Sequence, residues 1–245
     1  MHMSKIKEGG AVVTAATTGQ LPKHVGLILD GNRRWAKEHG VSTFEGHRQG
    51  YENLKDVADE AFDSGVEVVS AYIFSTENWN RSEEEVSYLM DLALKLFKRD
   101  LKKMYKKGIK VVWLGMPDRV RPAIINAINE AEKHTAENHR GTLALCFNYG
   151  GQAEIVDAVK KLMRRGIDEA RMTVQELEHE LYHPDIPPLD LIIRTSGEQR
   201  LSNFMLWRAA YSELLFVDKY WPAFSKADMH AALVDYENRQ RRMGA

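Results

Sequence analysis

The chain has 245 residues, 44% of them hydrophobic, which is enough for one large α/β domain with a sizeable core and predicts no second domain. Lys plus Arg (34) balance Asp plus Glu (35), so the net charge of −1 gives no indication of a nucleic-acid partner. The single cysteine, Cys146, excludes an internal disulfide framework or a cysteine-rich metal site and favours a cytoplasmic location.

Residues 1–20 are expected to form a flexible tail. They lack the basic start and apolar centre of a secretion signal. No apolar run in the sequence approaches the ~20 residues that a membrane-spanning helix needs. We therefore expect residues 21–245 to form the folded domain, with at most peripheral contact with a membrane.

From Leu21 onward, apolar runs typical of strands alternate with helical patterns. Strands are predicted at 24–30, 66–74, 109–115, 142–149, 189–195 and 214–218. Helices are predicted near 45–63, 82–107, 121–138, 151–165, 173–182 and 226–241. This alternation predicts an α/β fold with a mostly parallel central sheet of about six strands, flanked by helices. In such folds ligands bind beyond the carboxyl ends of the strands.

The first polar cluster follows the first strand and reads Asp30-Gly-Asn-Arg-Arg-Trp35. Gly31 allows the backbone to turn closely past a ligand before a helix begins near Arg34. A carboxylate repels phosphate, but Asp30 suits a magnesium ion that bridges to a pyrophosphate. The alternative is that Asp30 only caps the helix.

The second cluster, Ser75 to Arg81, follows the second strand. Ser75, Asn78 and Arg81 supply a hydroxyl, an amide and a guanidinium, which suit the orientation of a phosphate and the relay of a proton. A turn rich in Asn and Ser is the alternative. Ser82 and Glu85 have the spacing of a capping box that opens the next helix.

The third cluster, Arg194 to Ser202, follows the fifth strand. Arg194 and Arg200 are well matched to a diphosphate, because arginine keeps its charge and forms paired hydrogen bonds. Surface pairing with Glu198 is the alternative, and it accounts for one arginine more readily than for both. The three clusters are expected to converge at one edge of the sheet.

These segments, together with Gly46-His47, Asn148-Tyr-Gly-Gly151, Trp207, Ala210-Tyr-Ser-Glu213 and Arg242-Met-Gly244, resemble the cis-prenyltransferases, the undecaprenyl diphosphate synthase family. The match runs from about Leu21 to Gly244 in the family's order. The resemblance implies a homodimeric catalytic domain over 21–245 with a hydrophobic tunnel. It also implies condensation of isopentenyl diphosphate with an allylic prenyl diphosphate, in the presence of Mg²⁺, to form a Z-prenyl diphosphate.

The resemblance also implies roles for individual residues. Asp30 and Glu213 correspond to magnesium-associated carboxylates, and Asn78 to the residue near proton removal, where an amide orients rather than acts as a base. The implied substrate-binding residues are Gly31, Asn32, Arg33, Arg34, Trp35, His47, Ser75, Thr76, Glu77, Trp79, Arg81, Arg194, Arg200, Leu201, Ser202, Arg242 and Gly244. Of these, Arg242 and Gly244 would reach the partner subunit's phosphate site.

Some positions depart from long-chain members of the family. Arg33 stands in place of their glycine and Thr43 in place of an arginine, while Ile73 stands where they tend to carry alanine. Added side-chain volume shortens a tunnel, because overpacking costs ~1 to 3 kcal/mol. We therefore expect a product of C15 to C35, with undecaprenyl diphosphate as the rival. Apolar residues at 86, 89, 90, 93, 94, 97, 101 and 104 are tunnel candidates, although ordinary core is the commoner role of such a stripe.

Two other readings of the sequence remain. His179-Glu-Leu-Tyr-His183 fits a zinc-protease pattern, but Pro184 disfavours helix at His183 and no convincing third ligand follows. The chain also lacks DDxxD, P-loop and GxGxxG patterns. A non-catalytic protein that binds a prenyl diphosphate or completes a heterodimer is the alternative function. The retention of Asp30, Asn78, Arg194, Arg200 and Glu213 ranks catalysis ahead of it.

Overall fold

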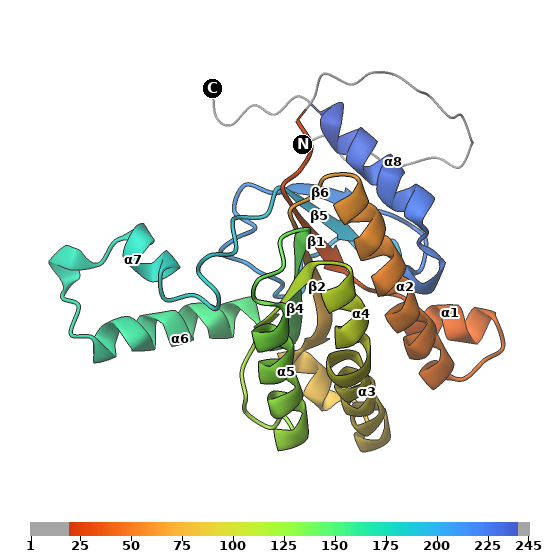
Figure 1. Ribbon diagram of the computed structural model, residues 1–245, viewed down its shortest axis with the longest axis horizontal. Coiled ribbons are helices and arrows are strands. Elements are labelled where there is room, and N and C mark those ends of the chain that lie inside the picture. The colour runs from red at the N-terminus through yellow and green to blue at the C-terminus, as the bar shows by residue number, and fades with distance from the viewer. Residues whose placement is uncertain (1–19, 240–245) are drawn as a thin grey trace. The chain divides into compact units, whose positions relative to one another are not determined.

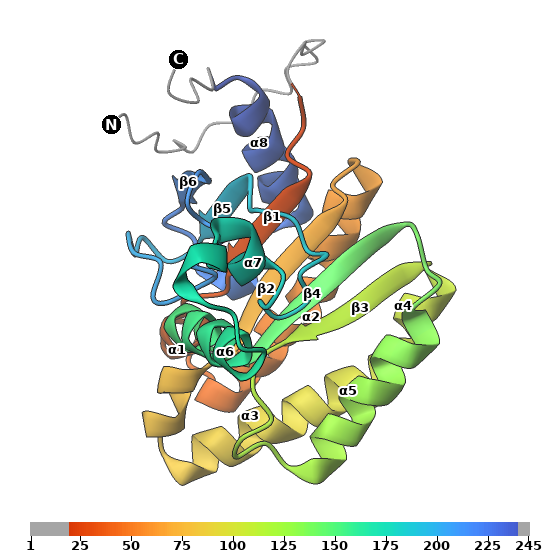
Figure 2. The same cartoon turned by 90° about the vertical axis from the view of Figure 1, so that its left-hand side faces the viewer.

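The computed structural model describes residues 20–239, without the side chains of 99–103. Residues 1–19 of the expected tail, and Arg242 and Gly244, lie outside the described residues. The strands are β1 (His24–Ile28), β2 (Val68–Ser75), β3 (Ile109–Leu114), β4 (Gly141–Tyr149), β5 (Leu191–Arg194) and β6 (Glu213–Phe216). They form a six-stranded sheet in the order β3-β4-β2-β1-β5-β6, which confirms the predicted α/β class (Figures 1 and 2).

The α-helices are α1 (Asn32–Glu38), α2 (Thr43–Asp63), α3 (Glu83–Lys95), α4 (Leu101–Lys106), α5 (Pro122–Thr135), α6 (Gly151–Arg164), α7 (Val174–Glu178) and α8 (Lys226–Glu237). Short 3-10 helices are η1 (Thr76–Asn80), η3 (Glu169–Arg171) and η4 (Trp221–Ala223), and η2 (Leu96–Asp100) is a π-helical turn.

Two compact units can be distinguished. The described part of the first consists of residues 20–71, 189–200 and 211–239, and that of the second of residues 72–188 and 201–210. Strand β2 contributes residues to both, with Ala71 as the last residue in the first unit. Each unit is described in turn.

In the first unit, β1, β5 and β6 are in parallel register. Val25 pairs with Leu191 and Ile28 with Arg194, while Leu191 pairs with Glu213 and Arg194 with Phe216. Helix α2 packs against α8 and η4 (Figure 1). The buried apolar residues of α2 recur at the helical spacing and form one stripe: Leu54, Val57, Ala58, Ala61 and Phe62. Residues at this spacing share one helix face, so the sequence itself creates the packing surface.

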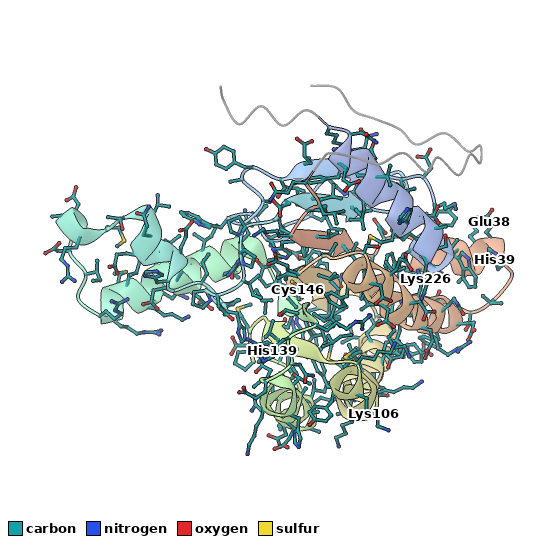
Figure 3. The ribbon with its side chains drawn as sticks, turned by 45° about the horizontal axis from the view of Figure 1, so that its top comes forward. Glu38, His39, Lys106, His139, Cys146 and Lys226 are labelled. Carbon is teal, nitrogen blue, oxygen red and sulfur yellow. The ribbon has the colours of Figure 1, made fainter. Side chains whose placement is uncertain are left out.

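In the second unit, β3 and β4 run parallel, from the pair Ile109–Gly141 to the pair Leu114–Cys146. Helix α5 packs against β3 and α3, and Figure 2 shows β3 and β4 side by side. Cys146 is fully buried in β4, where Figure 3 labels it, and burial raises the pKa of its thiol. An inert structural cysteine matches this setting.

Two predicted helices differ from the observed ones. The helix predicted over 82–107 extends over 83–106 and contains the π-helical turn η2 between α3 and α4. The helix predicted over 173–182 ends at Glu178, and the chain turns further on at His183, whose φ is 44°, before Pro184. Of the tunnel candidates, Met90, Ala93, Phe97 and Met104 are buried and the side chain of Leu101 is not described, so the tunnel stays a prediction.

No helix within residues 20–239 is long and apolar enough to cross a membrane.

Candidate active site

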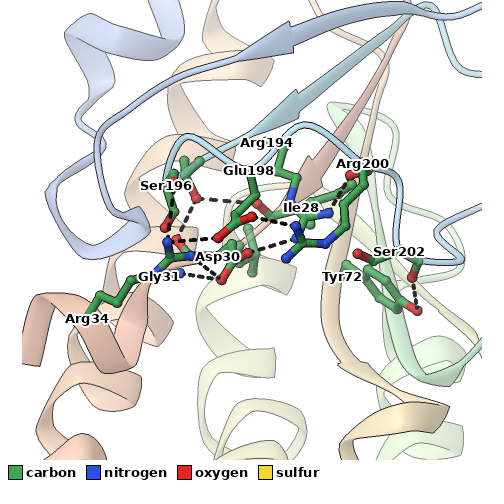
Figure 4. Close-up of polar contacts among 12 residues, drawn as sticks. Ile28, Asp30, Gly31, Arg34, Tyr72, Arg194, Ser196, Glu198, Arg200 and Ser202 are labelled. Carbon is green, nitrogen blue, oxygen red and sulfur yellow. Dashed lines mark hydrogen bonds and ion pairs between the residues drawn. The ribbon is translucent and has the colours of Figure 1, made fainter.

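Asp30 and Arg194 form the centre of a polar cluster in the first unit. Asp30 lies just beyond β1 and Arg194 is the last residue of β5, so the parallel register of these two strands brings the side chains together. Nη2 of Arg194 lies 2.8 Å from Oδ2 of Asp30 (Figure 4). The Arg194 side chain is 4% exposed and that of Asp30 is 31% exposed. The Asp30 carboxylate is therefore accessible to solvent, whereas the Arg194 side chain is buried.

Opposing effects set the pKa of Asp30. Burial raises it, but the hydrogen bond and charge of Arg194, the charge of Arg34 and the hydrogen bond from the Gly31 amide together lower it below its ordinary value. Nη2 of Arg34 lies 3.4 Å from Oδ1 of Asp30, and the Gly31 amide donates to Oδ1 over 2.8 Å. Asp30 is accordingly a carboxylate at neutral pH, as a metal or electrostatic role requires.

Glu198 connects two further arginines in the same cluster. Its carboxylate lies 2.9 Å from Nη1 of Arg34 and 2.5 Å from Nη1 of Arg200 (Figure 4). The hydrogen bond of Arg200 is the main cause that lowers the pKa of Glu198. The surface-pairing alternative is thus correct for Arg200, while Arg194 pairs with Asp30. Exposed pairs of this kind contribute little to stability, so Arg34 and Arg200 remain able to exchange Glu198 for an anionic ligand.

Gly31 allows the tight turn between Asp30 and α1. Its φ is 102°, in the left-handed region, and an added Cβ would lie 2.8 Å from Cδ1 of Tyr220. The N-cap of α1 is Gly31 itself, and no side chain caps this end. The interpretation of Asp30 as a simple helix cap is therefore wrong, and the predicted close turn at Gly31 is confirmed.

Ser196 is a member of this cluster that the sequence did not single out. It has a φ of 79° and is 7% exposed, and its buried hydroxyl has no hydrogen-bond partner within the described residues. Its carbonyl oxygen accepts a hydrogen bond from Arg34 over 3.3 Å. A serine in the left-handed region with an unsatisfied hydroxyl is strained.

Ser196→Gly is expected to raise the free energy of unfolding by about 0.5–1 kcal/mol, because relief of the left-handed strain exceeds the added freedom of glycine in the unfolded chain. Urea unfolding measures this difference. Ser196→Ala is the matched control, since it removes the hydroxyl but retains the strained backbone, and it should gain less. A loss of stability in Ser196→Gly would contradict the explanation.

Other predicted residues of the first unit lie on α1 and α2. Trp35 stacks on His39 with ring centroids 4.2 Å apart, and Figure 3 labels His39 at the end of α1, as the residue that follows Glu38. His47 on α2 is 8% exposed. A Cβ at the adjacent Gly46 would lie 2.3 Å from the carbonyl oxygen of Asn32, so glycine there permits the close approach of α2 to α1. Arg33 is exposed.

Glu213 does not join Asp30 within one chain. It opens β6 and lies level with Leu191 and Val25, whereas Asp30 follows Ile28, beyond the other end of these strands. About five residues of extended register separate them, roughly 15 Å. Glu213 instead forms an ion pair with Arg239 over 3.0 Å. The expectation that both carboxylates hold one ion is thus not met by the residues of a single copy.

The donor set around Asp30 fits a magnesium ion that arrives with phosphate. Mg²⁺ usually retains several waters and is bound through one or two carboxylates plus substrate phosphates. Within the described part of the chain, no group of three or more His, Cys, Asp or Glu side chains is placed to hold a metal alone. A single accessible carboxylate such as Asp30 is sufficient for a magnesium ion that is also bound by substrate phosphates. It is not sufficient for an ion that is bound by protein side chains alone.

The segment Ser75 to Arg81 belongs to the second unit. Oδ1 of Asn78 accepts a hydrogen bond from the Ser75 amide over 3.0 Å, which closes η1. Asn78 therefore has a local structural role that uses its amide oxygen. Arg81 donates to Glu85 over 2.7 Å, and Ser82 accepts from the Glu85 amide. Ser82 thus caps α3 as predicted, while the Glu85 side chain binds Arg81.

Asn148 and Asn203 fix the surroundings of this segment. Nε1 of Trp79 donates to Oδ1 of Asn148 over 2.7 Å, and Nδ2 of Asn203 donates to Glu77 over 2.9 Å. Burial raises the pKa of Glu77, but the hydrogen bonds, that of Asn203 foremost, bring it below its usual range. Both asparagines have positive φ, 49° and 65°. Apart from the tolerance of asparagine for left-handed backbone, no sequence pattern predicted these contacts.

Residues Leu201 to Met205 form a strained turn in the second unit. Ser202, Asn203 and Met205 have φ of 50°, 65° and 40°. The Tyr72 hydroxyl donates to the carbonyl oxygen of Ser202 over 3.3 Å (Figure 4). Leu201 is half-buried and Ser202 is exposed. Thr76 packs against Gly150. A Cβ added at Gly150 would lie 2.7 Å from the hydroxyl oxygen of Thr76.

The two histidines of the zinc-like pattern do not share a helix face. Helix α7 ends at Glu178, before both of them. Nε2 of His183 contacts Glu132 over 3.0 Å. The i, i+4 geometry that would direct both imidazoles to one ion is therefore not formed.

The parallel α/β fold and the carboxylate–guanidinium cluster beyond its strands have the chemistry that suits phosphorylated ligands. The family model described as putative undecaprenyl diphosphate synthase matches residues 28–244. The chain therefore belongs to the undecaprenyl diphosphate synthase family of prenyl-transferring enzymes, which confirms the resemblance.

Relatives include proteins of different names. The chain is 44% identical over 228 residues to the trans,polycis-polyprenyl diphosphate synthase ((2Z,6E)-farnesyl diphosphate specific) of Thermobifida fusca, which covers 91% of this chain and 81% of that protein. It is 42% identical over 233 residues to the decaprenyl diphosphate synthase of Mycobacterium leprae, covering 94% and 79%. The structure of lavandulyl diphosphate synthase from Lavandula x intermedia, in complex with dimethylallyl diphosphate, matches with a TM-score of 0.87 and 33% identity, covering 92% and 99%.

Proposed function

We propose that this chain, acting as one catalytic domain over residues 21–245, condenses isopentenyl diphosphate with an allylic prenyl diphosphate to form a Z-prenyl diphosphate. The pairing of Asp30 with Arg194, flanked by Arg34, Glu198 and Arg200, carries this proposal. It places an ionised, accessible carboxylate beside several guanidinium groups, so that one site can hold both a cation and a phosphate. A cytoplasmic location stays a prediction.

The reaction breaks an allylic carbon–oxygen bond, so negative charge develops on the departing diphosphate. Mg²⁺, when bound with substrate, supplies Lewis-acid stabilisation of that charge. In this proposal Asp30 holds the ion, and Arg34 donates to the diphosphate after it releases Glu198. Arg194 keeps Asp30 ionised and oriented. Prearranged charges lower the barrier because they need no reorganisation when the bond breaks.

The other predicted residues are assigned by resemblance. We propose Asn32, Arg33, Trp35 and His47 as neighbours of the allylic substrate, and Arg200, Leu201 and Ser202 as ligands of isopentenyl diphosphate. The amide oxygen of Asn78 closes η1, and we assign its nitrogen to donate a hydrogen bond to the diphosphate or water that accepts the proton leaving the condensing unit. Arg242 and Gly244 remain predictions about the partner subunit's phosphate site.

An assay of the purified chain alone tests the proposal. We expect incorporation of labelled isopentenyl diphosphate with farnesyl or geranyl diphosphate as primer, lost when EDTA removes Mg²⁺. Absence of product with every primer and metal would favour a binding protein or heterodimer subunit, the alternative function. Binding of the primer without turnover would identify that alternative directly.

A metal role for Glu213 needs a second copy of the chain, because one copy separates it from Asp30. Subunits carrying Asp30→Ala and Glu213→Ala, denatured together and refolded as a mixture, test this role. Activity above that of either variant alone supports a site shared across a homodimer. Unchanged activity of Glu213→Ala would restrict Glu213 to its ion pair with Arg239.

We expect Ile73→Ala to lengthen the main product by at least one five-carbon unit. Ile73 is half-buried in β2, and its side chain is proposed to limit the prenyl chain through steric overlap. Chromatography of radiolabelled products measures the change. Ile125→Ala, which truncates a half-buried isoleucine of α5, should leave product length unchanged. A C55 main product from the wild-type chain would defeat the short-chain proposal.

A further inference from the structure

A pocket in the second unit is lined by three arginines from two separate segments. Its volume is about 250 Å³, and its lining includes Trp79, Arg81, Val86, Met90, Arg119 and Arg121. Arg81 follows η1, Arg119 lies between β3 and α5, and Arg121 immediately precedes α5. We call this cavity the arginine pocket. Its volume lies just below the ~300 Å³ at which pockets for drug-sized ligands begin, so it suits a small group.

Arg119 is the arginine whose charge is least compensated. Within the described part of the chain, its guanidinium contacts no carboxylate and lies 4.3 Å from the centroid of the Trp79 ring. Arg81 pairs with Glu85 over 2.7 Å, and Arg121 pairs with Asp91 over 2.6 Å and also binds Ser87. Glu83 adds a carboxylate to the lining. The pocket thus offers many N–H donors. Arg119 supplies the positive charge that no carboxylate among the described residues neutralises.

The position of Arg119 is fixed by a buried asparagine. Nδ2 of Asn148 donates to the carbonyl oxygens of Met116 and Asp118, each over 2.8 Å. Oδ1 of the same side chain accepts from Trp79, the ring beneath the guanidinium. Arg119 itself has a φ of 65°, which is unfavourable for a non-glycine residue. Strained backbone held by a hydrogen-bonded support is characteristic of sites that are organised before a ligand arrives.

We propose that the arginine pocket binds a phosphate or diphosphate group, with Arg119 as the main charged ligand. Planar guanidinium groups bind phosphate oxygens through paired hydrogen bonds. Arg81 and Arg121 supply further N–H donors. The face of the Trp79 ring orients the Arg119 guanidinium through a cation–π contact. The diphosphate has two possible sources, free inorganic diphosphate and the head of a prenyl diphosphate, whose chain would lie on Val86 and Met90.

Calorimetric titration of the full chain with inorganic diphosphate, in EDTA, tests the proposal. We expect Arg119→Asn to lose one diphosphate per chain, or to weaken that site about tenfold or more. Asparagine tolerates the left-handed backbone, so this variant should fold. Arg164→Asn, at an exposed arginine at the end of α6, is the matched control and should bind as the wild type does. Identical isotherms for Arg119→Asn and the wild type would overturn the proposal.

A second variant changes the charge in the opposite direction. Glu83→Gln removes the carboxylate of the pocket lining and should tighten the same site. Because the readout is binding of inorganic diphosphate, the outcome does not depend on prenyl transfer. A non-cleavable farnesyl thiodiphosphate separates the two sources. Tighter binding than diphosphate at the Arg119-dependent site identifies a prenyl diphosphate, and equal binding identifies the free anion.

Discussion

Asp30→Asn is expected to reduce kcat by about a hundredfold to a thousandfold or more, the cost of removing one preorganised electrostatic group at a reacting centre. Asparagine keeps the size and one oxygen of the side chain but removes the negative charge. It therefore retains a hydrogen bond from Arg194 and loses the affinity for a divalent cation. Steady-state kinetics across a range of Mg²⁺ concentrations measure the effect, and Asp30→Ala should abolish turnover.

Asp228→Asn is the control for this prediction. Asp228 also pairs with a cation, Lys219, over 2.8 Å, but at the start of α8, away from the cluster around Asp30. Its activity should match that of the wild type. Circular dichroism of Asp30→Asn should show an intact fold. Substantial residual turnover in Asp30→Asn, with the fold intact, would remove Asp30 from the reaction.

The lowered pKa of Asp30 also predicts a pH dependence of stability. A carboxyl whose pKa is lower in the folded chain than its ordinary 3.8 stabilises the fold at pH values above 3.8. That contribution is lost as the pH falls through the lower, folded-state pKa. The difference in unfolding free energy between the wild type and Asp30→Asn should therefore be constant from pH 5 to 8 and shrink in stronger acid.

The sheet could be predicted from the sequence because each strand is a recognisable apolar run. Continuous apolar runs such as Leu191 to Ile193 identify buried parallel strands, and each strand was found within a few residues of its predicted bounds. Helix ends were harder to predict. The break between α3 and α4 depends on a local change of hydrogen bonding in an unbroken apolar pattern, which periodicity does not reveal.

The candidate site was partly predictable for the same reason. Asp30 and Arg194 each follow a strand, and adjacent parallel strands bring such residues together. The strand predicted at 214–218 already places Glu213 at the amino end of a strand, as observed for β6, so the expectation that it joins Asp30 came from the resemblance and not from the strand pattern. Ser196 and Asn148 lie in segments that the sequence analysis singled out, but no individual role was predicted for them or for Arg119, because their importance lies in positive φ and in contacts that only the fold creates.

A buried ion pair in the second unit is another contact of that kind. Nη1 of Arg208 lies 2.8 Å from Oε1 of Glu154, with side-chain exposures of 3% and 1%. Arg208 also donates to the carbonyl oxygens of Tyr182, His183 and Ile186. Glu154 accepts from the Tyr149 hydroxyl and the Tyr182 amide. The pair therefore joins the end of β4 and the start of α6 to the irregular segment that follows α7.

Arg208→Met is expected to lower the free energy of unfolding by about 3–5 kcal/mol, because it leaves the Glu154 carboxylate buried without its counter-charge. Urea unfolding measures the loss. Arg165→Met is the control, since Arg165 pairs with Glu180 from a half-exposed position, and it should lose less than about 1 kcal/mol.

The double variant Arg208→Met with Glu154→Leu distinguishes a missing charge from lost packing. Removal of both charges eliminates the desolvation cost of both buried groups, so the double variant should recover much of the loss seen in Arg208→Met. The recovery should stay incomplete, because the carbonyl oxygens of Tyr182, His183 and Ile186 lack Arg208 in both variants. The Tyr149 hydroxyl also loses its Glu154 partner in the double variant. If the two single losses simply add, the ion pair contributes no coupling, and the stability of this region comes from the backbone hydrogen bonds alone.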